Sequence, residues 1–121
     1  MPFDSASRAG DWLMARRTYQ AWSHSPLDEI TTANVGSLKL AWAWNMNEGG
    51  ANQVTPIVHA GVIFLSNTSN TVQALDARTG ELIWENRIGP QSRIAYGGTR
   101  SLAVYEDKVY VATTDAKIHA L

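Results

Sequence analysis

The chain has 121 residues, of which 45% are hydrophobic and only 17% are charged, and its formal net charge at pH 7 is -1. Its ten basic and eleven acidic residues are scattered without a run of one sign, which argues against a surface for nucleic acid or anionic lipid. The absence of cysteine excludes disulfides, thiolate metal sites and a cysteine nucleophile. No apolar stretch approaches the roughly 20 residues that span a bilayer, so we expect a chain that does not cross a membrane. Because an average soluble domain is roughly 25% charged, we also expect much of the surface to meet other protein.

Residues 1–37 predict an irregular N-terminal segment with short helical turns that packs on a larger body. A short helix over 11–17 is compatible with the composition, but the aromatic residues at 12, 19 and 22 lack helical periodicity. Ser25 and Pro26 suit the N-cap and first position of a turn or short helix, and Thr32 suits the cap of a second one that Gly36 ends. Residues 1–5 lack the basic start and apolar core of a signal peptide.

From residue 38 onward the pattern changes to short β-runs separated by turn residues. The runs are 38–44, 55–58, 62–66, 71–75, 81–88, 100–105, 109–113 and 117–121. Many short strands at regular spacing are typical of a β-sandwich, a β-barrel or a β-propeller.

Residues 74–84 predict a tight hairpin. Asp76 and Thr79 can bind turn amides through their side-chain oxygens, and Gly80 is the expected residue of positive φ. The hairpin places Trp84 beside the very small Ala74, a pairing that favours sheets stacked face to face.

An internal repeat decides between the β architectures. Residues 62–64 match 109–111 at an offset of 47, and residues 73–75 match 119–121 at an offset of 46, a difference that one deleted residue would explain. Residues 40–42 match 82–84 at an offset of 42. A period in the forties is the spacing of propeller blades.

The predicted fold is therefore all-β, a partial β-propeller of four-stranded antiparallel blades behind an irregular, short-helical N-terminal segment. Residues 1–37 form that segment, and residues 38–121 form the partial propeller. Within the propeller, 38–46 is the outer strand of one blade, 55–88 is a complete blade, and 100–121 is a truncated blade.

The hairpin also resembles a known family. It matches, position for position, the tryptophan-docking motif of the pyrroloquinoline quinone (PQQ) dependent alcohol dehydrogenases, which have eight-bladed propellers; the matching residues are Ala74, Asp76, Thr79, Gly80, Glu81 and Trp84. The resemblance extends to residues 11–12, 19, 24–27, 30, 34–35, 38, 42, 55–58 and 100–105. It covers nearly the whole chain but a minor part of the family's several hundred residues, so we expect an N-terminal fragment of such an enzyme.

Two residues are candidates for cofactor binding on this resemblance. Arg100 falls where the family has an arginine beside the quinone, and a guanidinium suits both the carboxylates and the quinone oxygens. Gln53 stands where the family has a glutamate that contacts the quinone, and its amide keeps the hydrogen bonds but not the negative charge. Residues 94 and 95 are Ile and Ala where many members carry two adjacent cysteines, and the glycines at 97 and 98 would let backbone approach the cofactor.

The resemblance further implies PQQ and a calcium-like metal ion in the full-length protein. The metal ligands and the catalytic aspartate belong to later blades, so no catalytic or metal residue is assigned in this chain. The implied reaction is oxidation of an alcohol by proton removal and hydride transfer to the quinone, with electrons leaving to a cytochrome in the periplasm. The implied partners of this segment are the remaining propeller blades.

Structural alternatives exist for each polar candidate. Arg100 could pair with Glu106 or Asp107, and Gln53 could be a plain loop residue. The histidines at 24, 59 and 119 lack metal-ligand spacing and suit surface or packing roles. The acidic residues at 11, 28 and 29 suit caps or solvated positions.

Two alternatives remain for the molecule as a whole. The first is a non-catalytic propeller of similar blades that serves as a binding or outer-membrane assembly scaffold. The second is a complete small protein. Repeat architectures generally need about three or more units for stability, which argues against this alternative.

Overall fold

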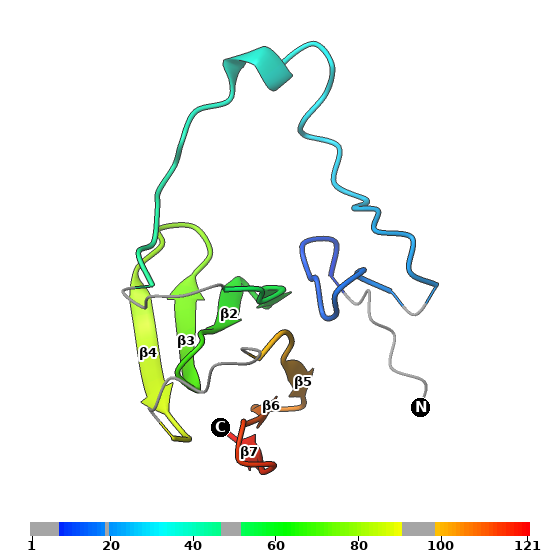
Figure 1. Cartoon of the computed structure of the whole chain (residues 1–121). Coiled ribbons are helices and arrows are strands. Elements are labelled where there is room, and N and C mark those ends of the chain that lie inside the picture. The colour runs from blue at the N-terminus through cyan, green and yellow to red at the C-terminus, as the bar shows by residue number, and fades with distance from the viewer. Residues whose placement is uncertain (1–7, 19, 47–51, 91–98) are drawn as a thin grey trace.

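The computed structural model describes residues 8–18, 20–46, 52–90 and 99–121, and it confirms the predicted all-β fold (Figure 1). One four-stranded antiparallel sheet follows chain order and consists of β1 (Ile57–His59), β2 (Val62–Ser66), β3 (Thr71–Asp76) and β4 (Leu82–Arg87). A three-stranded antiparallel sheet follows it and consists of β5 (Ala103–Tyr105), β6 (Lys108–Ala112) and β7 (Ile118–Ala120). The described part of the chain contains no helix that is long and apolar enough to cross a membrane.

The strand register corrects the repeat read from the sequence. Ile57 of β1 pairs with Phe64 of β2, and Ala103 of β5 pairs with Tyr110 of β6, so both partners are shifted by 46 residues. The offset of 47 for the β2 match, and the deletion inferred from it, are therefore wrong. Because β2 and β6 both contain runs of similar apolar residues, a sequence comparison can align them one residue out of register. In the structure, a one-residue shift in register would move every side chain of the strand to the opposite face of the sheet.

Backbone conformation repeats with the same period. Ala60 and Glu106, in the turns that follow β1 and β5, have φ of 52° and 53°. Asn70 and Ala116, in the turns that precede β3 and β7, have φ of 53° and 61°. Positive φ is uncommon for residues other than glycine, so its recurrence 46 residues later marks equivalent turns in two copies of one unit.

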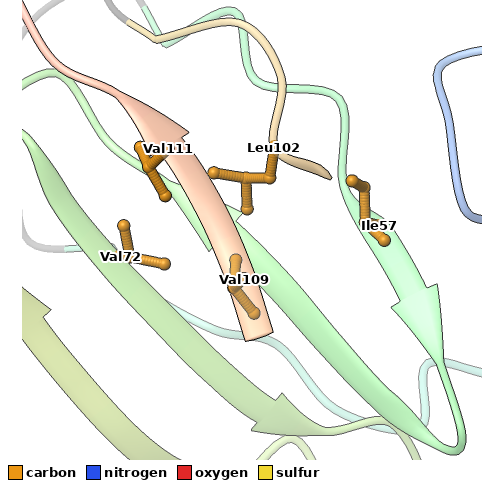
Figure 2. Packing of buried hydrophobic residues seen from close by; sticks show 5 residues of the cluster. All are labelled: Ile57, Val72, Leu102, Val109 and Val111. Carbon is orange, nitrogen blue, oxygen red and sulfur yellow. The ribbon is translucent and has the colours of Figure 1, made fainter. Parts of the chain in front are cut away.

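The core lies between the two sheets rather than within either. Figure 2 shows five buried side chains gathered there, from both sheets and the segment before β5: Ile57, Val72, Leu102, Val109 and Val111. Phe64 and Trp84 pack against this cluster, with their ring centroids 6.1 Å apart. Each sheet therefore covers the apolar face of the other, which is the arrangement of neighbouring propeller blades.

The turn between β3 and β4 has the predicted chemistry. One carboxylate oxygen of Asp76 accepts hydrogen bonds from the backbone N–H groups of Arg78 and Thr79, both at 2.8 Å. These bonds, that from Thr79 foremost, lower the pKa of Asp76 below its usual 3.8. Gly80 has φ of 74° and donates its N–H to the Asp76 carbonyl at 2.9 Å.

Residues 38–46 carry no strand, contrary to the prediction of an outer strand there. A strand is assigned through backbone pairing with a neighbour, and none of the strands in the described ranges pairs with this run. Its side chains nevertheless lie over the first sheet. Trp42 donates its indole N–H to the Ala77 carbonyl at 3.2 Å, and Trp44 donates its indole N–H to the Gln73 side chain at 3.1 Å.

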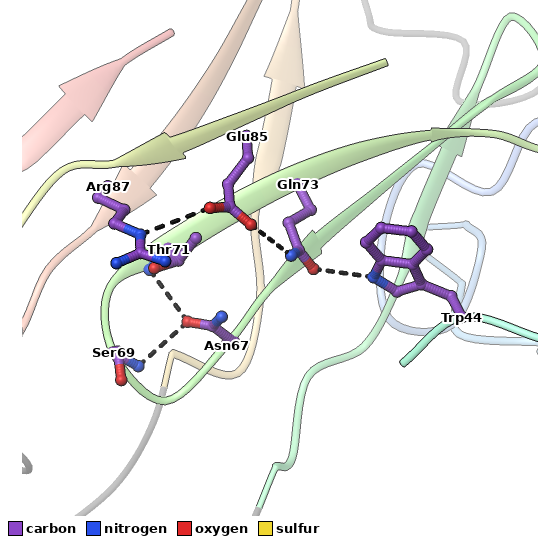
Figure 3. Close-up of polar contacts among 7 residues, drawn as sticks. All are labelled: Trp44, Asn67, Ser69, Thr71, Gln73, Glu85 and Arg87. Atoms are coloured by element: carbon purple, nitrogen blue, oxygen red, sulfur yellow. Dashed lines mark hydrogen bonds and ion pairs between the residues drawn. The ribbon is translucent and has the colours of Figure 1, made fainter. Parts of the chain in front are cut away.

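The contact of Trp44 belongs to a chain of polar side chains across β3 and β4. Figure 3 shows Gln73 between Trp44 and Glu85, with Glu85 in turn bound to Arg87. Gln73 is buried, and both ends of its amide are satisfied, by the indole and by the carboxylate at 2.7 Å. Burial of a polar group without such partners would be costly, so the network specifies where residues 42–44 sit on the sheet. In the same view Asn67 accepts the backbone N–H groups of Ser69 and Thr71 and shapes the turn before β3.

The N-terminal segment contains one short 3-10 helix, η1 (Val35–Ser37), in its described part. The prediction of a turn capped by Thr32 and ended by Gly36 is wrong in position, because Asn34 precedes the helix and its side chain binds the Thr31 N–H at 2.7 Å. No helix forms over residues 11–17 either. Trp12 instead forms an isolated antiparallel bridge with Val58 of β1.

Residues 26–41 arch away from both sheets and are exposed throughout (Figure 1). Several large apolar side chains on or beside this arch have no cover: Trp22, Leu27, Ile30, Val35, Leu38 and Leu40. So many exposed large apolar side chains within one segment favour a face that meets other protein.

Candidate cofactor-binding site

Gln53 and Arg100 lie at the same edge of the two sheets. Gln53 stands two residues before Thr55, whose backbone N–H donates to the Arg100 carbonyl at 2.9 Å. This bond joins the segment that leads into β1 to the segment that leads into β5. Two residues 47 positions apart in sequence are thus placed on neighbouring blades at one edge.

The Arg100 side chain is exposed and forms no ion pair among the described residues. Both acids that the sequence offered as partners are elsewhere, because Glu106 lies beyond the far end of β5 and Asp107 binds Lys108 at 2.6 Å. A guanidinium carries five N–H donors and a permanent positive charge. Arg100 can therefore bind an anionic group with planar geometry.

Thr99, the residue before Arg100, is held by two hydrogen bonds. The Ser66 hydroxyl donates to the Thr99 carbonyl at 3.2 Å, and the Thr99 hydroxyl donates to the Ala112 carbonyl at 3.4 Å. Ser66 ends β2 and Ala112 ends β6, so Thr99 bridges the two sheets. Sequence reasoning missed Ser66 and Thr99, because nothing local in the sequence links residues 33 positions apart.

Gln53 is exposed, so its amide is accessible from solvent. Its amide offers one acceptor and two donors. Residues 94–98, where the cysteine pair is replaced and the glycines stand, lie outside the described residues.

A pocket of about 420 Å³ lies between the two sheets, and neither Arg100 nor Gln53 lines it. Residues of both sheets line it, among them His59, Phe64, Trp84, Asn86 and Leu121. It is an opening between two packed blades and shares no residue with the candidate site.

Asp11 is not the solvated or capping residue that the sequence suggested. Its side chain is only 3% exposed, and it accepts the Ala60 backbone N–H at 3.0 Å and contacts His59 Nδ1 at 3.0 Å. Together with the Trp12 bridge, these contacts fasten the N-terminal segment to the free edge of β1.

No group of three His, Asp, Glu or Cys side chains suited to a metal ion occurs in the described ranges. The histidines at 59 and 119 stand on different sheets, and His24 is exposed in the N-terminal segment.

The chain matches known proteins over nearly its full length. The family model named PQQ, described as the β-propeller domain of glucose, ethanol and alcohol dehydrogenases, matches residues 12–121. A quinone alcohol dehydrogenase subunit of Gluconobacter oxydans is 37% identical over 98% of this chain, and quinohemoprotein alcohol dehydrogenase ADH-IIG of Pseudomonas putida is 37% identical over 93%. The chain spans 16% of the length of each of these relatives.

Solved structures agree with the sequence comparison. The quinohemoprotein alcohol dehydrogenase of Comamonas testosteroni superposes with a TM-score of 0.81 at 32% identity, covering 98% of this chain and 18% of that one. A europium-containing methanol dehydrogenase superposes with a TM-score of 0.78 over 95% of this chain and 21% of its own, at 23% identity, which supports the fold alone.

Proposed function

Because this chain belongs to the PQQ family of glucose, ethanol and alcohol dehydrogenase β-propellers, we propose that it is part of a PQQ-dependent dehydrogenase that oxidises alcohols or related substrates. In this proposal the described blades supply packing and one wall of the quinone site, and the segment by itself is inactive. The observation that carries the proposal is the Thr55–Arg100 hydrogen bond, which brings Arg100 and the Gln53 segment to one edge of neighbouring blades.

The side chains at this edge fit PQQ, a tricarboxylate with two adjacent quinone oxygens. Arg100 is exposed and has no acidic partner among the described residues, so its donors are available to a carboxylate or a quinone oxygen. Gln53 adds an amide that can donate to a carbonyl or carboxylate oxygen. Gln53 is neutral, so it adds hydrogen bonds to this edge without the negative charge of the family's glutamate.

The cofactor and the two side chains have different roles in this proposal. Bound PQQ supplies the carbon that accepts hydride from an alcohol. Arg100 holds and orients the cofactor and offsets negative charge at its oxygens, while Gln53 contributes a neutral hydrogen bond. The proton acceptor and the ligands of a calcium-like metal would come from blades outside the described residues.

Blade packing is the second contribution of this segment. Trp42 lies against the 76–80 turn, and Trp84 stands at the corresponding place on β4, beside the pocket between the sheets. We expect a turn equivalent to 76–80, supplied by the chain after Leu121, to occupy that pocket. The apolar arch of residues 26–41 would be covered by the remaining blades in the same way.

The cellular setting is also part of the proposal. Relatives of Pseudomonas putida and Comamonas testosteroni are named quinohemoproteins, and the relative of Gluconobacter oxydans is named a dehydrogenase subunit. These names support a cytochrome-type electron acceptor and an alcohol substrate for the whole protein. We propose a periplasmic location from the family resemblance alone, to be tested by cell fractionation.

The test is PQQ binding by the complete protein that carries this chain, prepared without cofactor and titrated by quenching of tryptophan fluorescence. Arg100→Ala is expected to weaken binding by about 10- to 100-fold, since a hydrogen bond to a charged group contributes about 1.5–3 kcal/mol. Arg100→Lys keeps the charge but loses the planar fork, so we expect an intermediate affinity. Dye reduction with alcohols, assayed after loading with PQQ and calcium, should fall in the same order.

Arg78→Ala is the matched control, because Arg78 is an exposed arginine on the turn at the opposite edge. Its affinity for PQQ should equal that of the unchanged protein. Complete absence of PQQ binding by the unchanged protein would overturn the proposal and favour a non-catalytic propeller scaffold.

A further inference from the structure

Ser66 occupies an unusual place relative to the candidate site. It ends β2, its side chain is 1% exposed, and its hydroxyl donates to the carbonyl of Thr99, the residue before Arg100. The contact crosses from the first blade to the segment that leads into the second. A buried hydroxyl has one hydrogen to donate, and a hydrogen bond from it to a loop carbonyl restrains that loop.

The peptide planes on both sides of Arg100 are held at their oxygens. Ser66 holds the Thr99 oxygen at 3.2 Å, and the Thr55 N–H holds the Arg100 oxygen at 2.9 Å. Each peptide unit is planar, so two fixed planes determine φ and ψ of the residue between them and the direction of its Cα–Cβ bond. The Thr99 hydroxyl adds a third, longer bond to Ala112 at 3.4 Å.

The Arg100 side chain itself forms no ion pair and no hydrogen bond with another described residue. Its direction therefore depends on the backbone. Supporting contacts that hold a binding group near its productive geometry reduce the cost of ordering it on binding.

We propose that Ser66 is a positioning residue for Arg100: its hydroxyl fixes the Thr99–Arg100 peptide and thereby aims the guanidinium at the quinone cofactor. The inference rests on the proposed function, because it assumes that Arg100 binds PQQ. Ser66, at the end of β2, would thus affect cofactor affinity without touching the cofactor itself.

The test is a double-mutant cycle on PQQ affinity, measured by fluorescence titration of the complete protein. Ser66→Ala should weaken binding by about three- to tenfold when Arg100 is present, the range that one neutral hydrogen bond supports. In the Arg100→Ala background the same change should alter affinity by less than about 1.5-fold, because its effect passes through the guanidinium. A merely structural role of Ser66 would produce equal losses in both backgrounds.

Ser37→Ala is the matched control, since the Ser37 hydroxyl also donates to a carbonyl, that of Asn34 at 2.7 Å, but in the exposed arch. It should leave PQQ affinity unchanged. If Ser66→Ala does not fold, Ser66→Cys replaces it, because a thiol of similar size is only a weak hydrogen-bond donor to the Thr99 carbonyl. The expected pattern across the two backgrounds is the same, with a smaller loss.

The outcomes separate the two proposals. If Arg100→Ala weakens binding and Ser66→Ala has no effect, or an equal effect in both backgrounds, the positioning role is wrong and the proposed function stands. If Arg100→Ala itself leaves PQQ affinity unchanged, the role of Arg100 in the proposed function fails, and the role of Ser66 fails with it.

Discussion

Gly80 meets two constraints at one position. Its φ of 74° lies in the left-handed region that glycine adopts without strain. A Cβ at this position would stand 2.6 Å from two carbon atoms of the Trp42 ring. Asp76 thus shapes the turn from within the hairpin, and the Trp42 indole, from a segment nearly forty residues earlier, packs against it. Both the positive φ and the close indole contact are possible because Gly80 has no side chain.

Replacement of Gly80 by alanine should destabilise the protein by about 2–5 kcal/mol, because a left-handed alanine costs about 1–2 kcal/mol and overpacking adds about 1–3. Urea unfolding of the complete protein would measure the loss. Gly61→Ala separates the two causes, since Gly61 has φ of 81° but open space around it and should show the backbone cost alone. Gly36→Ala, with neither constraint, should change stability by less than about 0.5 kcal/mol. Equal losses at Gly80 and Gly61 would show that the indole contact contributes nothing.

The turns between strands also join one blade to the next. Asn70, in the turn before β3, is 3% exposed, and its amide donates to the Pro90 carbonyl at 2.9 Å and to the Thr114 hydroxyl at 3.0 Å. Its oxygen accepts the Thr114 N–H at 3.2 Å. The equivalent residue one period later is Ala116, which has no such amide. The junction is therefore specific to this pair of blades rather than a feature of the repeat.

We expect Asn70→Ala to cost about 2–4 kcal/mol, because it leaves partners unpaired at a partly buried junction and places alanine at φ of 53°. Asn70→Gly removes the same bonds without the strain, so it should be less destabilising by about 1 kcal/mol. Asn34→Ala serves as the control, since Asn34 also makes side-chain hydrogen bonds, to Thr31 and Glu29, but is exposed. A loss at Asn70 no larger than the loss at Asn34 would contradict a joining role. Thermal unfolding of the complete protein provides the measurement.

At the scale of the whole molecule, the described residues form two neighbouring sheets with open flanks. The first sheet ends in β4 and the second in β5 and β7, and no described strand pairs with their outer edges. Unpaired edges and the apolar arch are surfaces through which chains associate. Repeat units of this kind bury their faces against neighbours and so depend on further blades.

The 121-residue chain expressed without additional blades is therefore expected to aggregate or to remain partly disordered. Size-exclusion chromatography with light scattering and a thermal melt would test this, with a longer product that includes further blades as the control. A monomeric 121-residue product that melts in one cooperative transition would contradict the expectation.

Local chemistry made much of the fold predictable. The Asp76–Gly80 turn was readable because its hydrogen bonds join residues at most four apart, and the blade repeat was readable because one unit recurs 46 residues later. The repeat was misread by one residue where similar apolar side chains are adjacent. The strand predicted over 38–46 was not found, because a strand needs a partner that the described chain does not supply.

The sequence by itself determined the all-β class and the turn that Trp42 covers, since these depend on residue type and short spacing. The candidate roles of Arg100 and Gln53 follow from the family resemblance alone. Only the tertiary structure decided that the segments of Arg100 and Gln53 meet, that Ser66 holds the peptide before Arg100, and that Asp11 is buried against His59. Those contacts join residues 33 to 48 positions apart. Their geometry arises from the packing of one sheet on another, and no local pattern encodes it.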